Sequence, residues 1–352
     1  MKEKLFWELI KIKSKLFLKI FMNGNIRILF FLLTLWQFNF IFAQSLDSNK
    51  IISVDTSFTI YSAAAKVVKD FPYAKLVSPK LPAEVDSFNN VEFLNYGKRK
   101  LRLDLFVPKN KEKKYPAVIL VHGGGWHSGN KSHQVPMAMD FASKGFIAAA
   151  VEYRLSDEAV YPAAVKDLKA SIKWMKVNSE KYGIDTSKIA ILGCSAGAQL
   201  ASLVGFSNNE SEYEPDDFFP EISSDVHAVV NIDGLLDFTS SESKEFDIEP
   251  DKPRSAHLWF GSSYKNNPEL WKKGSPYFHV DEKDIPIVFI NSSIPHYHAG
   301  RDDMIKKLDK FNIYYEVYTI ENTPHPFWLF HPWYAETFGF VESFLKNVFR
   351  LN

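Results

Sequence analysis

Residues 189–204 read IAILGCSAGAQLASLV, and this stretch decides the fold. The apolar run at 189–192 is typical of a strand buried on both faces of a parallel sheet, and the small apolar residues at 196–204 predict a helix. Between them, Gly193-Cys194-Ser195-Ala196-Gly197 fits Gly-x-Ser-x-Gly. Its glycines permit a sharp strand-to-helix turn that exposes the serine at a helix N-terminus. The pentapeptide alone arises by chance in roughly one chain in ten. Its position between strand and helix therefore carries the prediction that Ser195 is a nucleophile.

A second glycine motif lies about 70 residues earlier, directly after the apolar run AVILV at 117–121. It reads His122-Gly123-Gly124-Gly125-Trp126. Three successive glycines leave backbone N–H groups free to point at a ligand, and acyl-transfer enzymes need such donors where the tetrahedral intermediate becomes negative. An ordinary glycine turn is the alternative. A four-residue match of this kind occurs in only a few chains per thousand, on the order of 10⁻³ by composition.

Outward from these motifs, apolar runs and helical periodicity alternate along the chain. Such alternation predicts right-handed crossovers, a parallel sheet, and ligand sites at the carboxyl ends of its strands. Two polar insertions, at 207–221 and 238–283, are expected to be surface loops or lids. The expected strands cover 91–95, 101–107, 117–121, 146–151, 189–192, 226–232, 285–290 and 314–320, and the expected helices cover 162–182, 196–204, 302–311 and 335–348.

Composition narrows the class of protein. The 352 residues favour one large domain with small extensions, and 46% hydrophobic residues are ordinary for a globular chain. Lys+Arg and Asp+Glu balance at 42 each, so no bulk charge attracts nucleic acid or anionic lipid. Cys194 is the only cysteine, which excludes an intramolecular disulfide.

The N-terminus has the pattern of an export signal. Basic Arg27 precedes the apolar run ILFFLLTLWQFNFIFA at 28–43, which ends on the small residue Ala43. The run is shorter than the roughly 18–20 residues that span a bilayer, which favours a cleaved signal peptide over 1–43 rather than a stable membrane anchor. Met22 is an alternative translation start. The protein is thus expected to be secreted or periplasmic.

Residues 44–86 form an N-terminal extension ahead of a main domain at 87–352. Within the extension, 58–61 is interpreted as a strand, 63–69 as a short helix and 78–82 as a linker. The extension is expected to pack on the main domain.

From residue 91 to the C-terminus the chain resembles the α/β-hydrolase superfamily, and within it the esterases with a His-Gly-Gly-Gly oxyanion motif, which include hormone-sensitive-lipase-like and feruloyl- or acetyl-esterase-like enzymes. The segments at 151–155 (VEYRL) and 161–167 (YPAAVKD) match the family between its two motifs. The resemblance implies an eight-stranded, mostly parallel sheet and an oxyanion hole built from the amides of Gly124, Gly125 and Ala196. It assigns structural roles to Tyr153 and Arg154, and requires neither cofactor nor metal.

The family's chain order is serine, acid, histidine, which places the base after the last strand. His325 follows the strand expected at 314–320 and is the predicted base. His331 is the competitor, and its place before Pro332-Trp333 suggests a loop residue that precedes the final helix.

The acid is harder to assign, because no carboxylate follows the strand at 285–290, where the family usually places it. Asp302 is the first choice, although an aspartate at this position also suits a helix N-cap. Asp303, Asp237 and Asp233 follow in that order.

Aromatic residues of the loops suggest the substrate. Trp126 and Trp328, with Tyr297 and Trp333, are expected near the mouth, where they either stack on sugar or aryl rings or pack the loops. His298, with His296 and Arg301, is expected to contact a polar substrate. We expect a secreted carboxylic-ester hydrolase that removes acetyl or feruloyl groups from plant polysaccharide or oligosaccharide. The alternatives are a non-catalytic hydrolase-fold module that binds carbohydrate or a partner protein, and a lipase or peptidase of the same fold.

Overall fold

The continuous apolar runs form the centre of one eight-stranded sheet. The computed structural model describes residue 55 and residues 57–208, 210–243 and 255–351. The sheet order is β2-β3-β5-β4-β6-β7-β8-β9, antiparallel at β2–β3 and β3–β5 and parallel elsewhere. The predicted mostly parallel sheet is therefore confirmed. Its strands are β2 (Val85–Asn95), β3 (Lys100–Pro108), β4 (Tyr115–Val121), β5 (Ile147–Val151), β6 (Ile184–Cys194), β7 (Ala228–Ile232), β8 (Ile287–Ser292) and β9 (Tyr315–Ile320).

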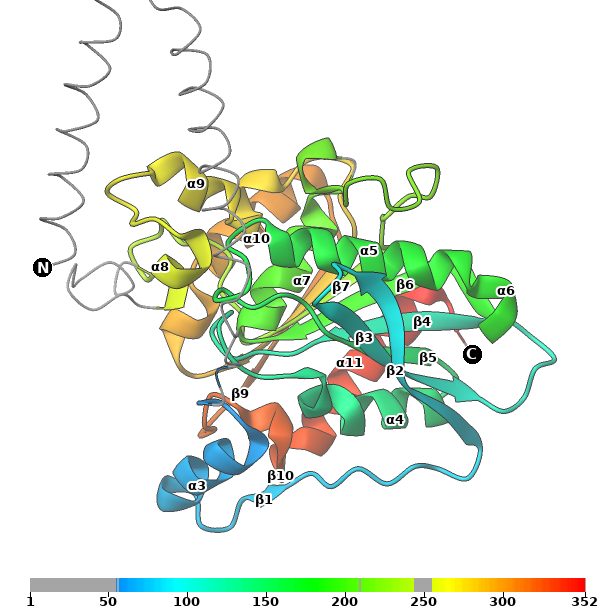
Figure 1. The fold of residues 1–352 in the computed structure, drawn as a ribbon. Coiled ribbons are helices and arrows are strands. Elements are labelled where there is room, and N and C mark those ends of the chain that lie inside the picture. Colours follow the sequence, from blue (N-terminus) through cyan, green and yellow to red (C-terminus); the bar gives the residue numbers. More distant parts are fainter. Residues whose placement is uncertain (1–54, 56, 209, 244–254, 352) are drawn as a thin grey trace, which may run out of the picture. The chain divides into compact units, whose positions relative to one another are not determined.

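Helices cover both faces of the sheet, as Figure 1 shows. The side chains of β4 alternate between two hydrophobic clusters, with Ile119 in one and Val118 and Leu120 in the other. This alternation buries every residue of the strand, which explains why its sequence is continuously apolar. The first cluster includes residues of α5 (Ala163–Val177), α7 (Ala196–Phe206) and α10 (Arg301–Phe311), and the second includes residues of α3 (Ile60–Asp70), α4 (Val135–Ser143) and α11 (Trp333–Phe349).

The predicted helix at 162–182 is two helices, because α5 ends at Val177 and α6 (Ser179–Tyr182) follows it. Between them, the side chain of Asn178 donates a hydrogen bond of 2.9 Å to the carbonyl of Trp174. An asparagine side chain that bonds to the backbone competes with continuation of the helix.

The register between β4 and β6 brings the two glycine motifs together. Val121 pairs with Gly193, so the chain leaves both strands at the same carboxyl edge. A Cβ on Gly123 would lie 2.7 Å from the carbonyl oxygen of Cys194, and one on Gly197 would lie 2.4 Å from that of Val121. The two turns are in backbone contact, which only glycine permits at these points.

The predicted strand at 58–61 is wrong, because Ile60 and Tyr61 begin helix α3. Thr59 is its N-cap: its side chain accepts a hydrogen bond from the amide of Ser62, and the Ser62 side chain accepts one from the amide of Thr59. This reciprocal capping box stabilises a helix start despite the β-branched residues around it.

The described part of the extension packs into the core of the main domain. Ala63 and Val67 of α3 are buried in the same cluster as α4 and α11. Strand β1 (Lys75–Leu76) pairs antiparallel with β10 (Phe330–His331) near the C-terminus. The predicted signal peptide at 1–43 lies outside the described residues. Across the described ranges, no helix combines the length and the apolar character that a membrane crossing requires.

The insertion at 238–283 differs from the polar loop that its composition predicts. It contains α8 (Ser255–Phe260) and α9 (Pro268–Lys273) and carries a buried aromatic cluster. Trp259 and Phe260 lie with ring centroids 4.7 Å apart, and Phe260 stacks on Trp271 at 4.6 Å. Aromatic side chains spaced irregularly among polar residues give no periodic signal, so the sequence pattern conceals this small core.

Two adjacent valines of α3 test how strongly the extension is packed. Val67 is 5% exposed and Val68 is 42% exposed. Replacement of Val67 by alanine is expected to lower the free energy of unfolding by about 1–2 kcal/mol, because it removes two buried methyl groups and leaves a small cavity. Val68→Ala is the matched control, with an expected change within about 0.5 kcal/mol. Urea denaturation measures both, and equal effects would contradict the packing described here.

Candidate active site

Ser195 stands on a strained turn between β6 and α7. Its backbone has φ 55° and ψ −126°, a conformation that is rare for a residue with a side chain. A Cβ on Gly193 would lie 1.9 Å from the carbonyl oxygen of Gly197, so the turn closes only with glycine at this position. The Ser195 amide donates a 2.9 Å hydrogen bond to the carbonyl of Ile232 at the end of β7. This geometry holds the Ser195 hydroxyl at the carboxyl edge of the sheet.

Three side chains from separate strand ends form a hydrogen-bonded series. Ser195 Oγ lies 2.7 Å from His325 Nε2, and His325 Nδ1 lies 2.7 Å from Asp233 Oδ2. A carboxylate can only accept hydrogen bonds, so Nδ1 carries the proton and Nε2 accepts the serine hydroxyl. The Asp233 side chain is fully buried. This is the arrangement in which an imidazole can take a proton from a serine.

Asp233 is held by its own backbone and by the neighbouring strand. It follows β7 directly with φ 52°, and its amide donates to the carbonyl of Ile290 at 2.9 Å. Ser292, the last residue of β8, donates its amide to Asp233 Oδ1 at 3.0 Å and its hydroxyl to Oδ2 at 2.8 Å. These hydrogen bonds satisfy the buried carboxylate oxygens and fix the orientation of the side chain.

The prediction that Asp302 supports the histidine is wrong in this structure. Asp302 lies in the first turn of α10, where it forms an ion pair with Arg301 at 2.7 Å and its side chain is 69% exposed. The first turn of α10 faces solvent at Asp302. The positive end of the helix dipole lies there and stabilises an acidic side chain. The carboxylate instead comes from one strand earlier, and the end of β8 supplies Ser292 as a donor to it.

The other two candidate acids also have partners away from His325. Asp303 forms an ion pair with Lys306 at 2.7 Å on the surface of α10. Asp237 accepts hydrogen bonds from the amide and the hydroxyl of Thr239, at 2.7 and 2.8 Å. Both carboxylates therefore stabilise local turns.

The signal that singles out Asp233 is its position. It follows a fully buried strand directly and precedes Gly234, where a Cβ would lie 2.8 Å from the carbonyl oxygen of Ser195. An Asp-Gly pair directly after a buried strand is therefore the signal that could have placed Asp233 first among the candidate acids.

His331, the competing base, lies in β10 and is exposed. Its backbone pairs with that of Lys75. This pairing leaves it on the surface, whereas His325 contacts Ser195.

The loop after β4 places backbone amides beside the serine. Gly124 has φ 126° and Gly125 has φ 60°, and a Cβ on Gly124 would lie 2.1 Å from the carbonyl oxygen of Ser128. The buried His122 stabilises the loop, since its Nδ1 lies 2.8 Å from the carbonyl oxygen of Gly123. Burial lowers the pKa of His122 to about 3, so its ring is neutral and donates this bond.

These amides are available to a ligand. Within the described part of the chain, the N–H groups of Gly124, Gly125 and Ala196 have no hydrogen-bond acceptor. All three residues line one pocket together with Ser195. Unpaired donors that converge beside a nucleophile are suited to a developing oxyanion.

The pocket over the serine has a volume of about 320 Å³. Tyr297 forms part of its wall and stacks on the His325 ring, with centroids 3.4 Å apart and an interplanar angle of 8°. Burial and the charge of Asp233 raise the pKa of Tyr297, so its hydroxyl stays protonated. Seven further residues that line this pocket carry no signal in the sequence pattern, namely Ser57, Phe58, Lys66, His127, Ser128, Leu235 and Ser255.

Of the three residues predicted to bind substrate, Trp126 alone lines this pocket. It is nevertheless buried, because its indole stacks on Trp259 at 5.4 Å and donates to Gln199 at 2.8 Å. Trp328 is also buried and meets the His325 ring edge-on at 5.2 Å. His298 is half-buried and is not among the residues that line the pocket. Burial and the positive charge of nearby Arg301 lower its pKa. Of the two alternatives for Trp126 and Trp328, the structure shows loop packing, because both rings are buried against neighbouring side chains.

The fold and this site define an α/β-hydrolase, with a serine turn and a glycine loop at the carboxyl edge of a mostly parallel sheet. The chain belongs to the BD-FAE family, whose model matches residues 103–297. The match includes Ser195 and Asp233 and ends before His325.

Curated relatives include esterases of Mycobacterium tuberculosis. Esterase LipQ is 30% identical over 194 residues, which are 55% of this chain and 43% of LipQ. The probable carboxylic ester hydrolase LipM is 29% identical over 242 residues, or 66% of this chain and 54% of LipM. The chain thus spans about half the length of these relatives.

Solved structures share the fold at low identity. A truncated carbohydrate esterase from gut microbiota superposes with a TM-score of 0.64 at 23% identity, covering 77% of this chain and 99% of that one. Propionate-bound esterase 2 of Thermogutta terrifontis gives a TM-score of 0.61 at 20% identity, covering 77% and 96%.

Covalent labelling tests the hydrogen-bonded series. Paraoxon is expected to phosphorylate Ser195, and mass spectrometry of peptides identifies the site and the rate. Asp233→Asn should slow labelling by a factor on the order of 10³–10⁴, because the amide no longer holds the imidazole in the required tautomer. Asp302→Asn is the matched control and should label at the wild-type rate. Slow labelling of Asp302→Asn together with normal labelling of Asp233→Asn would reverse the assignment.

Proposed function

We propose that this protein is a serine carboxylic-ester hydrolase with Ser195 as nucleophile, His325 as general base and Asp233 as the acid. One observation carries the proposal: the hydroxyl of Ser195, hydrogen-bonded to His325, lines the same pocket as the unpaired amides of Gly124, Gly125 and Ala196. Nucleophile, base and oxyanion donors are the parts that acyl transfer requires. Membership of the BD-FAE family and similarity to esterases support the same activity.

The reaction follows from the positions of these groups. Ser195 Oγ attacks the ester carbonyl while its proton passes to His325 Nε2. The carbonyl oxygen becomes negative and accepts hydrogen bonds from the amides of the glycine loop and Ala196. Collapse of the intermediate breaks the bond to the alcohol, which leaves with the proton held by His325. Water then attacks the acyl-enzyme by the same route, and Ser195 regains its proton.

Asp233 and Ser292 position the base in this proposal. Asp233 fixes the Nδ1–H tautomer of His325 and stabilises the imidazolium that forms during each step. Ser292 donates two hydrogen bonds to the same carboxylate, which keeps it oriented toward His325. Tyr297 covers one face of the imidazole and restricts its rotation.

The substrate that we favour is an acylated plant polysaccharide or oligosaccharide that carries acetyl or feruloyl groups. Support comes from structural similarity to a carbohydrate esterase from gut microbiota and to a bifunctional GH43-CE protein of Bacteroides eggerthii. The pocket of about 320 Å³ suits a small acyl group, with the saccharide outside it. The alternative of a non-catalytic module depended on a missing acid, and Asp233 removes that ground. No observation on the described residues of the site favours a lipase or a peptidase of the same fold.

A panel of polysaccharides tests this proposal. Acetylated xylan, acetylated pectin and feruloylated arabinoxylan are incubated with wild type and Ser195→Ala, and released acetate and ferulate are measured by chromatography. We expect release by wild type and a loss of kcat on the order of 10⁶-fold in the variant. Hydrolysis of 4-nitrophenyl acetate without release from any polysaccharide would overturn the substrate class alone. Equal activity of wild type and Ser195→Ala on that ester would overturn the mechanism.

We further propose export through a signal peptide that is cleaved after Ala43. The pattern at 27–45 supports it: a basic residue, an apolar run and a small residue at the cleavage position. N-terminal sequencing of the protein from the medium or periplasm of an expressing bacterium is expected to begin at Gln44. Ala43→Tyr should block cleavage at this position, because signal peptidase requires a small side chain there. A protein that retains 28–43 would contradict the proposal.

A further inference from the structure

Lys66 is a residue of the catalytic pocket that the proposed reaction does not use. It lies on α3 of the N-terminal extension and lines the pocket together with Ser195. Its side chain is exposed, and it forms no hydrogen bond or ion pair with any other residue that the structure describes. A positive charge that the protein leaves uncompensated beside a nucleophile acts on a bound substrate.

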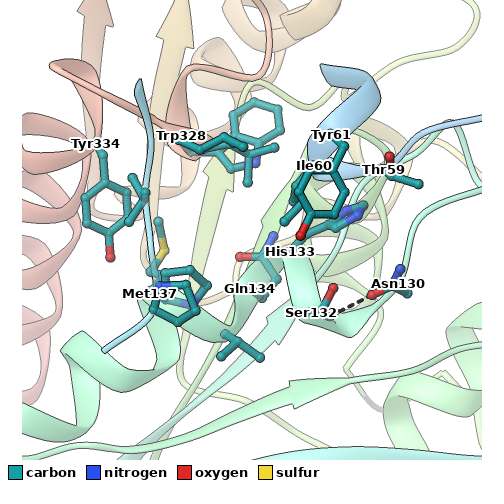
Figure 2. A pocket seen from close by; sticks show the side chains of 16 residues that line it. Thr59, Ile60, Tyr61, Asn130, Ser132, His133, Gln134, Met137, Trp328 and Tyr334 are labelled. Carbon is teal, nitrogen blue, oxygen red and sulfur yellow. Dashed lines mark hydrogen bonds between the residues drawn. The ribbon is translucent and has the colours of Figure 1, made fainter. Parts of the chain in front are cut away.

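Contacts of the extension fix the place of Lys66 in the pocket wall. Shortly before α3, the backbone of Asp55 forms a parallel bridge with Ser128 in the loop after β4. Figure 2 shows the start of α3, residues 59–61, at a cavity that it shares with the turn before α4. Val67, the residue after Lys66, is buried in the core. The stem of the lysine therefore starts at a fixed point, while the ammonium group at its end moves on a flexible chain.

The other charged side chains at the pocket have partners within the protein. Asp233 is the only acid among the described residues that line it, and this carboxylate is buried and bonded to His325. Asp55 lies outside the lining, and its carboxylate is 2.8 Å from Nδ1 of His127. The pocket therefore presents the ammonium group of Lys66 to a ligand without a competing carboxylate from its own described wall.

The exposure of Lys66 indicates which part of a substrate it meets. The ester carbonyl has to lie between Ser195 and the amide of the buried Ala196, whereas Lys66 is in contact with solvent. Lys66 therefore faces the part of the substrate that protrudes from the pocket, which in the proposed function is the saccharide. An ammonium group attracts an anion over several ångströms, whereas a neutral sugar offers it only hydrogen bonds for which water competes.

We propose that Lys66 selects acylated saccharides that carry a negative charge near the ester, which in plant polysaccharide is the carboxylate of a uronic acid. The inference rests on the proposed ester hydrolysis and specifies its substrate. The carboxylate pairs with the ammonium group while the ester carbonyl lies at Ser195. Lys66 does not touch the reacting atoms, so it stabilises the bound substrate and the transition state alike and acts on KM rather than on kcat.

Two polymers that differ only in charge test this specificity. Acetylated polygalacturonate and the same polymer after methyl esterification of its carboxylates carry the same acetyl groups, and acetate release gives kcat and KM for each. We expect the preference of wild type for the charged polymer to fall about fivefold in Lys66→Gln through KM, the upper value for one exposed ion pair. Lys66→Glu should lower it further by repulsion. At about 1 M NaCl, wild type and Lys66→Gln should show the same preference, because salt screens the pair.

Lys69 provides the matched control, because it is exposed on the same helix and does not line the pocket. Lys69→Gln removes the same charge and should keep the wild-type preference. A structural effect of either substitution would change the rates on both polymers alike and leave the preference between them as it is in wild type.

Binding without turnover separates this inference from the proposed activity. In Ser195→Ala, calorimetric titration with acetylated oligogalacturonate and with its methyl ester measures affinity whether or not the protein is an esterase. We expect tighter binding of the charged oligomer, and Lys66→Gln on this background should remove most of the difference. Equal binding of the two oligomers, a wild-type preference in Lys66→Gln, or an equal loss of preference in Lys69→Gln would overturn the inference. Full ester hydrolysis by Ser195→Ala, with the charge preference in binding intact, would overturn the proposed mechanism alone.

Discussion

Backbone contact between two glycine turns is the constraint on which the rest of this site depends. The parallel pairing of Val121 with Gly193 ends β4 and β6 at the same level, and the turns that follow touch without intervening side chains. The contact places the amides of the glycine loop beside the Ser195 hydroxyl. A Cβ at Gly123, Gly193 or Gly197 would lie within 2.7 Å of a backbone oxygen and force the turns apart. The separation of nucleophile and oxyanion donors is thus set by backbone packing.

The parts of the fold that the sequence predicts are those encoded locally. Continuous apolar runs indicate the buried strands, and the glycine motifs locate Ser195 and the loop after β4, because each signal lies within a few adjacent residues. The pairing of Asp233 with His325 joins residues 92 positions apart and depends on which strand end faces the histidine. No local pattern contains that information. The resemblance directed attention to the end of β8, whereas this chain places Ser292 there and the carboxylate at the end of β7.

The N-terminal extension shows a second limit of local patterns. Residues 58–61 have the β-propensity of a strand, yet the reciprocal bonds of Thr59 and Ser62 start a helix at Ile60. Capping depends on two specific side chains, and it outweighs an average preference over four residues. The consequence extends beyond the helix, because this start places Phe58 in the catalytic pocket. The extension therefore shapes the catalytic pocket, although its sequence carries no motif.

Backbone strain is concentrated at the edge where the chemistry is proposed. Trp126, Ser195 and Asp233 have φ of 63°, 55° and 52°, and they follow β4, β6 and β7. Each such conformation costs of order 1–3 kcal/mol and persists only where its surroundings enforce it. Hydrogen bonds to the neighbouring strand ends hold two of these conformations, from the Ser195 amide to Ile232 and from the Asp233 amide to Ile290. The buried indole of Trp126 donates to Gln199 and holds the third. The fully buried strands beneath supply the stability that offsets this cost. A more relaxed turn would stabilise the protein, but it would withdraw Ser195 from His325, which explains why the strain and the candidate site coincide.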